Sequence, residues 1–147
     1  MKIIDQIKQL RDETGVSVTE CQKALKEAGS DIIKAKDILR NWGKELAAKK
    51  AARETSQGIV ESYIHPNKKM GVLLELNSET DFAAKSADFQ NLAHELCLQI
   101  AAMEEESSLL EQPWIKDPSK TIKDLISECT SKLGENIVVK RFSRFKL

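Results

Sequence analysis

The side chains in this sequence best able to carry out chemistry are three cysteines and two histidines. Cys21, Cys97 and Cys129 lie far apart and include no CxxC pair, which predicts neither a disulfide framework nor a zinc site. His94 stands three residues before Cys97, a spacing that metal ligands use on a helix, but His65 is the only other imidazole. We therefore expect the cysteines to pack as small apolar side chains and expect no metal site.

Short motifs that bind phosphate or position a nucleophile are missing from the sequence. It contains no GxxxxGK[ST] or GxGxxG loop, no nucleophile elbow and no HExxH pair. Its many Asp and Glu residues could supply a carboxylate pair, but nearly every soluble protein offers as much. The sequence therefore gives no indication of an enzyme or of a bound cofactor.

An unusual group of side chains stands in NSETDFAAKS, residues 77–86. Asp81, the aromatic Phe82 and two alanines follow an apolar stretch that is typical of a buried strand. In one interpretation, Thr80 or Asp81 caps a helical turn and Phe82 folds back into the core. In the other, Phe82 is an exposed aromatic anchor that fills a pocket on a partner, and its small neighbours let that partner approach closely. The residues alone do not decide between the two.

The composition of the whole chain is that of a soluble globular protein. Of its 147 residues, 31% are charged and 41% are hydrophobic, and the formal net charge is zero. Neutrality argues against a protein whose main role is to bind nucleic-acid phosphates, although a local basic patch is compatible with it. The sequence has no apolar run of signal-peptide type and none long enough to cross a membrane. We expect a cytosolic protein.

Three short helices are predicted in residues 1–43. Gly15 ends the first helix, Ser17 with Glu20 three residues later forms a capping box that opens the second, and Asp31 favours the start of the third. The apolar residues at helical spacing are Ile3, Ile4, Ile7 and Leu10 in the first helix, and Ile32, Ala35, Ile38 and Leu39 in the third. Short turns between these helices indicate a compact bundle.

Residues 44–57, KELAAKKAARETSQ, are rich in alanine and in charge. They carry no strong apolar face. We interpret them as a solvated helix or linker, which divides the chain into a bundle (1–43), a linker (44–57) and a second module (58–147).

The second module is predicted to be α+β. GIVESYIH and MGVLLELN read as strands that the turn HPNKK joins into a hairpin. A long helix from about Ser86 or Asp88 to Met103 is followed by EEESS, by a loop with two prolines (LLEQPWIKDPSK), by a helix over 121–133 and by a third strand in NIVVKRFSRFKL. We expect three antiparallel strands with helices packed on one face.

Four blocks stand along the chain in order: LRDETGVSVTECQKALKEAGSDIIKAKDILR, ETDFAAK, LLEQPWIKD and GENIVVKRFSRF. The first resembles the LRxxTGxxxxDCKKAL segment of the translation elongation factor Ts family, the second resembles its TDFVA signature, and the other two resemble further blocks of that family. A lone TDF would have little specificity, so the resemblance depends on the ordered set. It implies a three-helix fold of ubiquitin-associated type for residues 1–43.

The resemblance implies a guanine-nucleotide exchange factor that binds elongation factor Tu and supports translation elongation in the cytoplasm. In the family, the TDF segment inserts between helices of the partner's GTPase domain and displaces elements that hold the Mg²⁺ of the nucleotide. This implies that Phe82 is the wedge, that Asp81 places a charge near the Mg²⁺ side, and that Thr80 and Ala83 support them. Because Mg²⁺ bridges phosphate oxygens, disturbing its ligands weakens GDP binding.

A second contact with the GTPase domain is implied where the first helix ends and the second begins. Its residues would be Arg11, Thr14, Gly15, Val16, Val18 and Thr19. The sequence departs from the family here, because small residues and methionines are usual over positions 16–19 and Asp is common where Glu20 stands. These departures indicate a surface tuned to one partner. Ala83 in place of the usual Val shortens a side chain without altering the wedge.

A larger departure from the family follows Met103. Longer members carry a second copy of the core module and a helical coiled-coil insertion, whereas here only EEESS separates the first core helix from LLEQPWIKD. Short members with one core module dimerise, and the last strand here could leave an unpaired edge. We therefore expect a homodimer.

Two functions of other classes stay open as alternatives. A nucleic-acid-binding module could use Lys49, Lys50 and Arg53 together with the final KRFSRFK, in which Phe142 and Phe145 alternate with basic residues. Those phenylalanines would otherwise be core residues of a strand. A ubiquitin-associated-like adaptor would need the bundle alone, which the blocks beyond residue 43 disfavour.

Overall fold

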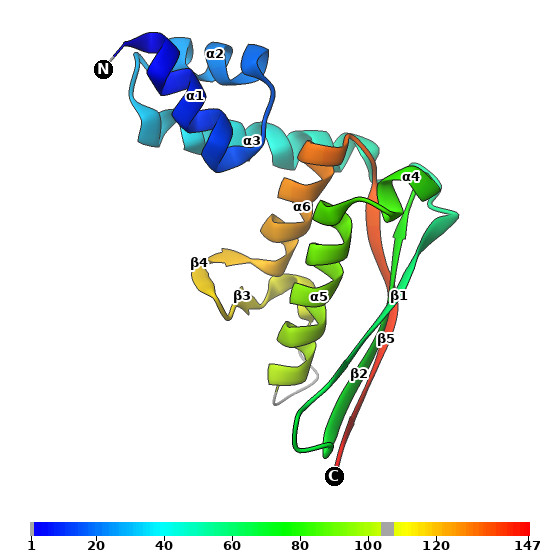
Figure 1. Cartoon of the computed structure of the whole chain (residues 1–147). Coiled ribbons are helices and arrows are strands. Elements are labelled where there is room, and N and C mark those ends of the chain that lie inside the picture. Colours follow the sequence, from blue (N-terminus) through cyan, green and yellow to red (C-terminus); the bar gives the residue numbers. More distant parts are fainter. Residues whose placement is uncertain (1, 104–107) are drawn as a thin grey trace.

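The computed structural model of this chain describes residues 2–103 and 108–147, so most of the expected EEESS segment lies outside the described residues. Figure 1 shows a small helical bundle at the N-terminus and a larger module in which helices lie against a sheet. The expected α+β fold, with an N-terminal helical region and a three-stranded antiparallel sheet packed against helices, is confirmed. None of the helices in the described ranges is both long and apolar enough to cross a membrane.

The N-terminal bundle packs around a small apolar core. Its helices are α1 (Ile3–Thr14), α2 (Val18–Glu27) and the first half of α3 (Ile32–Lys50). The buried side chains are Leu10, Cys21, Ala24, Leu25, Ala28, Ala35 and Leu39. Ile3 and Ile4 share the helical spacing of Leu10 but are exposed. The first helix therefore packs through its second half.

The ends of these helices are set by the residues that the sequence indicated. Gly15 ends α1 in the left-handed conformation (φ 71°), which glycine adopts without a Cβ clash. The Ser17 hydroxyl accepts the backbone N–H of Glu20 at 3.3 Å and opens α2. The Asp31 carboxylate accepts the N–H groups of the first turn of α3. Side-chain caps thus fix two of the three helix starts.

One continuous helix connects the bundle to the rest of the chain. α3 has 19 residues and spans the boundary expected at residue 43, so the first half of the expected linker is helical. Gly43 is buried where α3 crosses α6 (Ile122–Leu133), and a Cβ on Gly43 would lie 3.5 Å from the Cβ of Ser131. The Lys50 ammonium donates to the carbonyl of Gly134, at the end of α6. The bundle is therefore attached to the core module through helix packing as well as through the chain.

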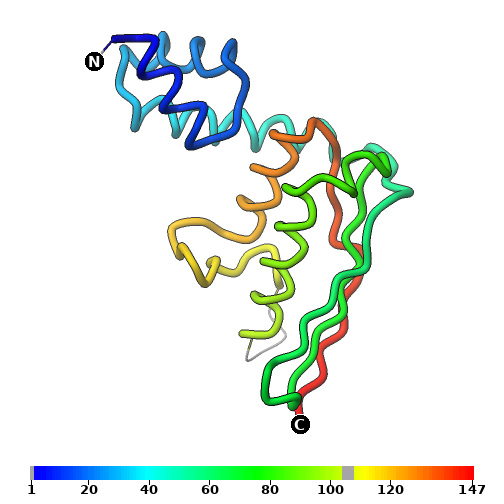
Figure 2. Tube along the Cα trace, viewed as in Figure 1, coloured from blue at the N-terminus to red at the C-terminus, as the bar shows by residue number. Residues whose placement is uncertain are grey.

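A three-stranded antiparallel sheet forms the back of the core module. Its strands are β1 (Gln57–Ile64), β2 (Met70–Ser78) and β5 (Ile137–Lys146), in the spatial order β1-β2-β5. Figure 2 traces them side by side, with α5 (Ala87–Ala102) and α6 covering one face. Val72, Leu74 and Leu76 of the central strand are buried beneath these helices, whereas Leu73 faces the other way. The β1–β2 hairpin, the antiparallel third strand and the helices on one face are those expected from the sequence, whereas the place of β5 beside β2 was not predicted.

The loop expected between the two long helices contains a small second sheet. A 3-10 turn (Leu109–Glu111) leads into β3 (Pro113–Trp114), which pairs with β4 (Asp117–Thr121). The buried amide of Gln99 holds this segment on α5: it donates to the carbonyl of Pro113 at 3.1 Å and accepts the N–H of Ile115 at 3.0 Å. Two prolines and strands this short leave no period-2 pattern, so the sequence-based loop was wrong here.

The face of the sheet away from α5 and α6 is not covered by another element among the described residues. Residues paired directly across strands point to the same side. Two such rows across β1, β2 and β5 point outward: Ile64–Gly71–Phe145 and Ser62–Leu73–Ser143. The exposed apolar side chains on this open sheet face are Val60, Ile64, Leu73 and Phe145. An apolar sheet face without a cover is typical of an interaction surface.

Candidate functional site

The stretch that raised the functional question forms a single helical turn at one end of the sheet. α4 (Asp81–Ala84) begins directly after β2, and the Thr80 hydroxyl caps it by accepting the N–H of Ala83 at 3.2 Å. Ser86 then caps α5 and also donates its hydroxyl to the carbonyl of Ala83 at 2.7 Å. Two successive caps therefore hold four residues between a strand and a long helix.

Phe82 projects from this turn into solvent. Its side chain is 88% exposed, whereas Ala83 and Ala84 behind it are buried. The interpretation in which Phe82 folds back into the core is wrong, although its helix cap is present. The second interpretation supposed that the alanines face a partner, but both are buried in this protein. Their small side chains instead let α4 lie close to β1 and β2, which leaves the ring as the part of the turn that reaches outward.

Asp81 lies beside Phe82 on the surface. Its carboxylate pairs with the Lys85 ammonium at 2.8 Å, and this hydrogen bond raises the pKa of Lys85. Both side chains are mostly exposed, so water and salt screen the pair and a partner can separate it at little cost. The carboxylate of Asp81 is thus available to a protein that docks over Phe82.

A carboxylate that the sequence did not single out holds α4 in place. Glu135 follows α6, and its Oε1 accepts the N–H groups of Glu79 at 3.1 Å and of Thr80 at 2.9 Å, while Oε2 accepts the Thr80 hydroxyl at 2.6 Å. In the other direction, the Glu79 carboxylate accepts the N–H of Asn136 at 3.1 Å. Two exchanged carboxylates therefore tie the segment before Phe82 to the start of β5. In the sequence, Glu135 stood out only as part of the family-like block that begins GENIVV, and nothing there indicated that it would bind Thr80.

The linker from α3 joins the same network. The guanidinium of Arg53 lies 3.7 Å from the Glu79 carboxylate, and the buried Asn136 amide donates to the carbonyls of Ala51 and Arg53. Asn136 is therefore bonded to the segment that leads into β1. The contacts place α4, the end of α6, the start of β5 and the end of α3 in one hydrogen-bonded cluster.

The residues expected at the N-terminal contact form a turn between α1 and α2. Thr14 donates its hydroxyl to the carbonyl of Leu10 at 2.7 Å and accepts the N–H of Val16 at 3.3 Å. Val16 packs partly against the bundle core. The exposed members of the expected set are Arg11, Gly15, Val18 and Thr19. Thr14 and Val16 thus shape the turn, and its exposed members form the available surface.

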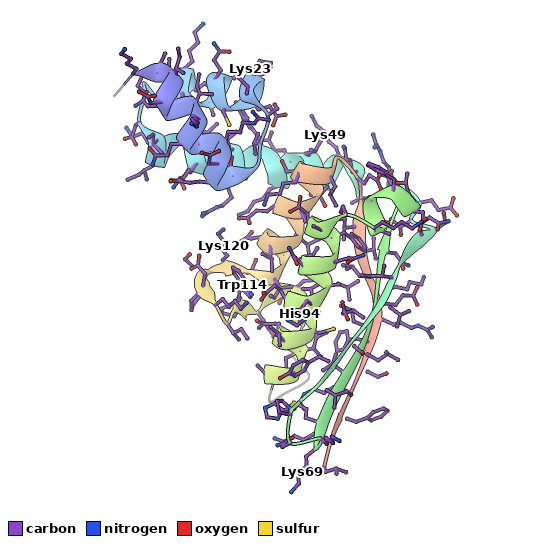
Figure 3. All side chains as sticks on the ribbon, in the orientation of Figure 1. Lys23, Lys49, Lys69, His94, Trp114 and Lys120 are labelled. Carbon is purple, nitrogen blue, oxygen red and sulfur yellow. The ribbon has the colours of Figure 1, made fainter. Side chains whose placement is uncertain are left out.

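The turn faces the core module across a cleft of about 250 Å³ between the bundle and α6. A Cβ on Gly15 would lie only 2.9 Å from Cε of Lys132, so glycine permits this approach. Lys120, labelled in Figure 3, also lines the cleft from β4. Figure 1 shows α4 on the far side of α6 from the bundle, so the two expected contact regions are separate surfaces.

The cysteines pack as the sequence predicted. All three are unpaired and buried, and burial raises the pKa of Cys97 to about 11 and that of Cys129 to about 12. His94 is exposed on α5 (Figure 3), whereas Cys97 three residues later is buried beneath it. Among residues 2–103 and 108–147, no three His, Cys, Asp or Glu side chains gather as metal ligands do.

Two of the basic residues proposed for nucleic-acid binding are engaged within the chain itself. Lys50 is bonded to a carbonyl and Arg53 lies against Glu79. Phe142 pairs with the inward-facing Leu74, whereas Phe145 points to the open sheet face. Bases stacked on both rings would have to lie on opposite sides of the sheet, so the structure gives this alternative no support.

Comparison with known proteins settles the family of the chain. The family model described as Elongation factor TS matches residues 2–104 and, in a second match, residues 79–147. This chain belongs to the elongation factor Ts family. Elongation factor Ts of Coprothermobacter proteolyticus is 43% identical over 188 aligned positions, which cover 96% of this chain and 95% of that protein. Its counterpart in Thermodesulfovibrio yellowstonii is 41% identical, covering 96% and 94%, and that of Herpetosiphon aurantiacus is 38% identical, covering 98% and 96%.

These elongation factor Ts relatives carry an internal segment that this chain lacks. The alignment with the Coprothermobacter protein has 188 positions against 147 residues here, so at least 41 positions (188 less 147) are gaps in this chain. Since nearly the whole chain is covered, the gap is internal. The two family matches overlap over residues 79–104, which points to a missing segment within or next to this stretch.

Proposed function

We propose that this protein binds elongation factor Tu in its GDP-bound form and accelerates the release of GDP. The observation that carries the proposal is the exposed ring of Phe82 on a capped turn, in a chain of the elongation factor Ts family. Exchange of this kind involves no covalent chemistry, because the protein only has to bind the nucleotide-free partner more tightly than the GDP-bound one.

Phe82 is the wedge of this mechanism. Most of its side-chain surface is free to enter an apolar pocket of the GTPase domain. A buried aromatic anchor is commonly worth about 2 kcal/mol to an interface. Because Thr80 and Glu135 already hold the turn in the free protein, binding does not have to order it first, and more of the interaction energy remains for displacing the partner's Mg²⁺-side elements.

Asp81 places a negative charge beside the wedge. Mg²⁺ neutralises phosphate oxygens in GTPases, so an added carboxylate competes with, or displaces, the groups that hold the ion. Thr80 and the buried Ala83 support this pair from within the turn. Because thermodynamic coupling is reciprocal, a factor that weakens GDP binding is itself weakened when nucleotide rebinds, and it then dissociates.

The N-terminal bundle (1–43) provides a second contact, joined to the core module (58–147) through residues 44–57. Its exposed turn, with Arg11, Val18 and Thr19, would bind the GTPase domain at a distance from α4. Two linked contacts raise the effective concentration of each other, so a modest bundle contact can recruit the partner while Phe82 acts. We also propose that the protein works in the cytoplasm.

We further propose that two copies associate through the open sheet face. Its apolar side chains lie on the side of the sheet opposite α5, whereas α4 stands at one end of the sheet. A two-fold pairing of this face would bury Val60, Ile64, Leu73 and Phe145 in each copy. Both α4 turns would then stay free for a GTPase partner.

The test is release of a fluorescent GDP analogue from elongation factor Tu, followed with and without catalytic amounts of this protein. We expect faster release with the wild type, and a large loss of that effect with Phe82→Ala and with Asp81→Ala. Ile33→Ala is the matched control, because Ile33 is also an exposed apolar residue but lies on the bundle away from both contacts. No acceleration by the wild-type protein with its cognate partner would refute the proposal.

A further inference from the structure

An apolar groove of about 660 Å³ runs between α3, α6 and β5. Its volume lies within the range of known binding sites, about 300–1,000 Å³. Its apolar lining consists of Ala47 and Ala48 on α3, Ala51 at the C-cap of α3, Leu109 and Leu110 in the 3-10 turn, Ile126 on α6, and Ile137, Val138, Val139 and Phe142 on β5. Neither the α4 turn nor the N-terminal turn contributes to it.

The groove follows the outer edge of β5. This strand is last in the order β1-β2-β5, so its other edge has no neighbouring strand among the described residues. Ile137, Val138 and Val139 all line the groove although successive side chains of a strand point to opposite faces. A space along the outer edge of β5 accounts for these three lining residues. The backbone N–H and C=O groups of β5 that point away from β2 would then face this apolar space.

The wall opposite β5 is formed by small side chains. Ala47 and Ala48 lie near the end of α3 and Ala51 is its C-cap residue, and all three present only methyl groups. Adjacent strands of a sheet stand about 4.8 Å apart, and the side chains of an added strand need room on both of its faces. Small residues opposite an unpaired strand edge provide that room, whereas leucines at these positions would fill it.

The free charge at the groove is positive. The charged residues that line it are Lys44, Lys123 and Asp124. Asp124 is already satisfied, because its carboxylate lies 3.2 Å from the Lys44 ammonium and accepts the N–H of Thr121 at 3.0 Å. Lys123 is exposed and makes no ion pair with the described residues. An acidic side chain of a bound segment could pair with Lys123, and the one acidic lining residue, Asp124, is already neutralised by Lys44.

The overlap of the two family matches over residues 79–104 indicates that the additional positions of the relatives lie within or beside this stretch. Leu109 and Leu110, which follow it in the chain, form one end of the groove. At least 41 aligned positions are gaps in this chain. The lining that adjoins the missing segment is thus open in the described part of this protein.

We propose that the groove binds an extended apolar segment of a partner protein that carries acidic residues, added as a fourth strand along β5. Main-chain hydrogen bonds to the open edge would hold the segment, alternate apolar side chains would enter the groove, and acidic ones would meet Lys123. This binding site is distinct from the proposed contacts with the GTPase, and it does not depend on nucleotide exchange.

The probe is a short acetylated peptide in which valine and glutamate alternate, titrated into the full chain while backbone amide resonances are recorded by NMR. We expect shifts and slower amide exchange over residues 137–142. Ala48→Glu and Lys123→Glu should each weaken binding about tenfold or more, because both put a negative charge beside the peptide. Ala52→Glu is the matched control: it adds the same charge at an exposed alanine that does not line the groove, and it should leave binding unchanged.

Three results would overturn the proposal. The first is the absence of binding by the wild type at millimolar peptide, and the second is shifts centred on the open sheet face instead of β5. The third is concentration-dependent protection of residues 137–142 without peptide, since a second copy of the chain would then occupy the edge. Peptides with a central proline, or with lysine in place of glutamate, should bind more weakly, and equal binding of either would contradict strand addition or the charge preference.

Discussion

Glu135 binds Thr80 with both oxygens of its carboxylate: one accepts the backbone N–H at 2.9 Å and the other accepts the hydroxyl at 2.6 Å. The two residues are 55 positions apart in the chain. Since the same hydroxyl of Thr80 caps α4, the start of β5 fixes the orientation of the turn that carries Phe82. The orientation of the turn that presents the ring therefore depends on a residue far from Phe82 in the sequence.

Replacing Glu135 should slow exchange without removing Phe82. Glu135→Ala leaves two backbone N–H groups and one hydroxyl without their acceptor, and we expect it to cost about 1–3 kcal/mol of stability. GDP release per folded molecule should fall several-fold, and amide exchange at residues 79–83 should rise. Glu135→Gln keeps one acceptor oxygen, so its stability and its GDP release should lie between those of the wild type and of Glu135→Ala. Unchanged amide exchange at these residues in Glu135→Ala would show that the carboxylate does not position the turn.

Phe82→Ala should separate function from stability. Because the ring is exposed in the free protein, the free energy of unfolding should change by only about 0.5 kcal/mol or less. Truncation of a buried phenylalanine would cost about 3–5 kcal/mol. Exchange should slow by about tenfold or more. Denaturant unfolding measures the stability, and GDP release measures the exchange activity. Large destabilisation with normal release would mean that Phe82 serves in packing and not as the wedge.

Val18→Asp should weaken recruitment of the GTPase. Val18 is exposed at the start of α2, so a charge there would face the proposed bundle contact without disturbing the core. We expect a higher concentration of factor to be needed for half-maximal acceleration, with little change in melting temperature. Ile33→Asp adds the same charge to another exposed position of the bundle and should have no effect. Equal effects of the two variants would mean that Val18 has no specific role.

The protein should sediment as a dimer of twice 16.5 kDa at micromolar concentration. Leu73→Glu places a charge in the middle of the open sheet face and should yield monomers that still fold, because the native side chain is exposed. Ile33→Glu, on the bundle, should remain dimeric. A wild-type mass of 16.5 kDa at high concentration would exclude this association, and a dimeric Leu73→Glu would place the interface elsewhere.

The buried thiols should react slowly in the folded protein. With a pKa of about 11 for Cys97 and about 12 for Cys129, the thiolate fraction at neutral pH is about one in 10⁴ or less. Denaturation should therefore speed alkylation by orders of magnitude. The stability contributed by the neutral thiols is complete below about pH 8.5, their unfolded pKa, and is lost as the pH rises through the folded values. Rapid labelling of both thiols at pH 7 in the folded protein would contradict this.

Local sequence signals predicted the elements of this fold well. Gly15, Ser17 and Asp31 mark helix ends through their own backbone or side-chain preferences, and the apolar run of β2 identified it as a buried strand. Contacts made at long range were not predictable. Nothing near Glu135 indicates that it would bind Thr80, and nothing near Phe82 decides whether an aromatic residue in a capped turn points in or out. The family resemblance, rather than the residues, favoured the exposed ring.

Because α3 continues without a break from the bundle into the core module, the rotation of the bundle relative to the core depends on how many residues of α3 lie between them. An α-helix turns about 100° and rises about 1.5 Å per residue. One residue inserted after Leu39, the last buried side chain that α3 gives to the bundle core, and before Gly43 would therefore rotate the bundle by about 100° around the axis of α3 and move it by about 1.5 Å along that axis. The number of residues in this part of α3 would therefore determine whether the two proposed contact surfaces can bind one partner at the same time.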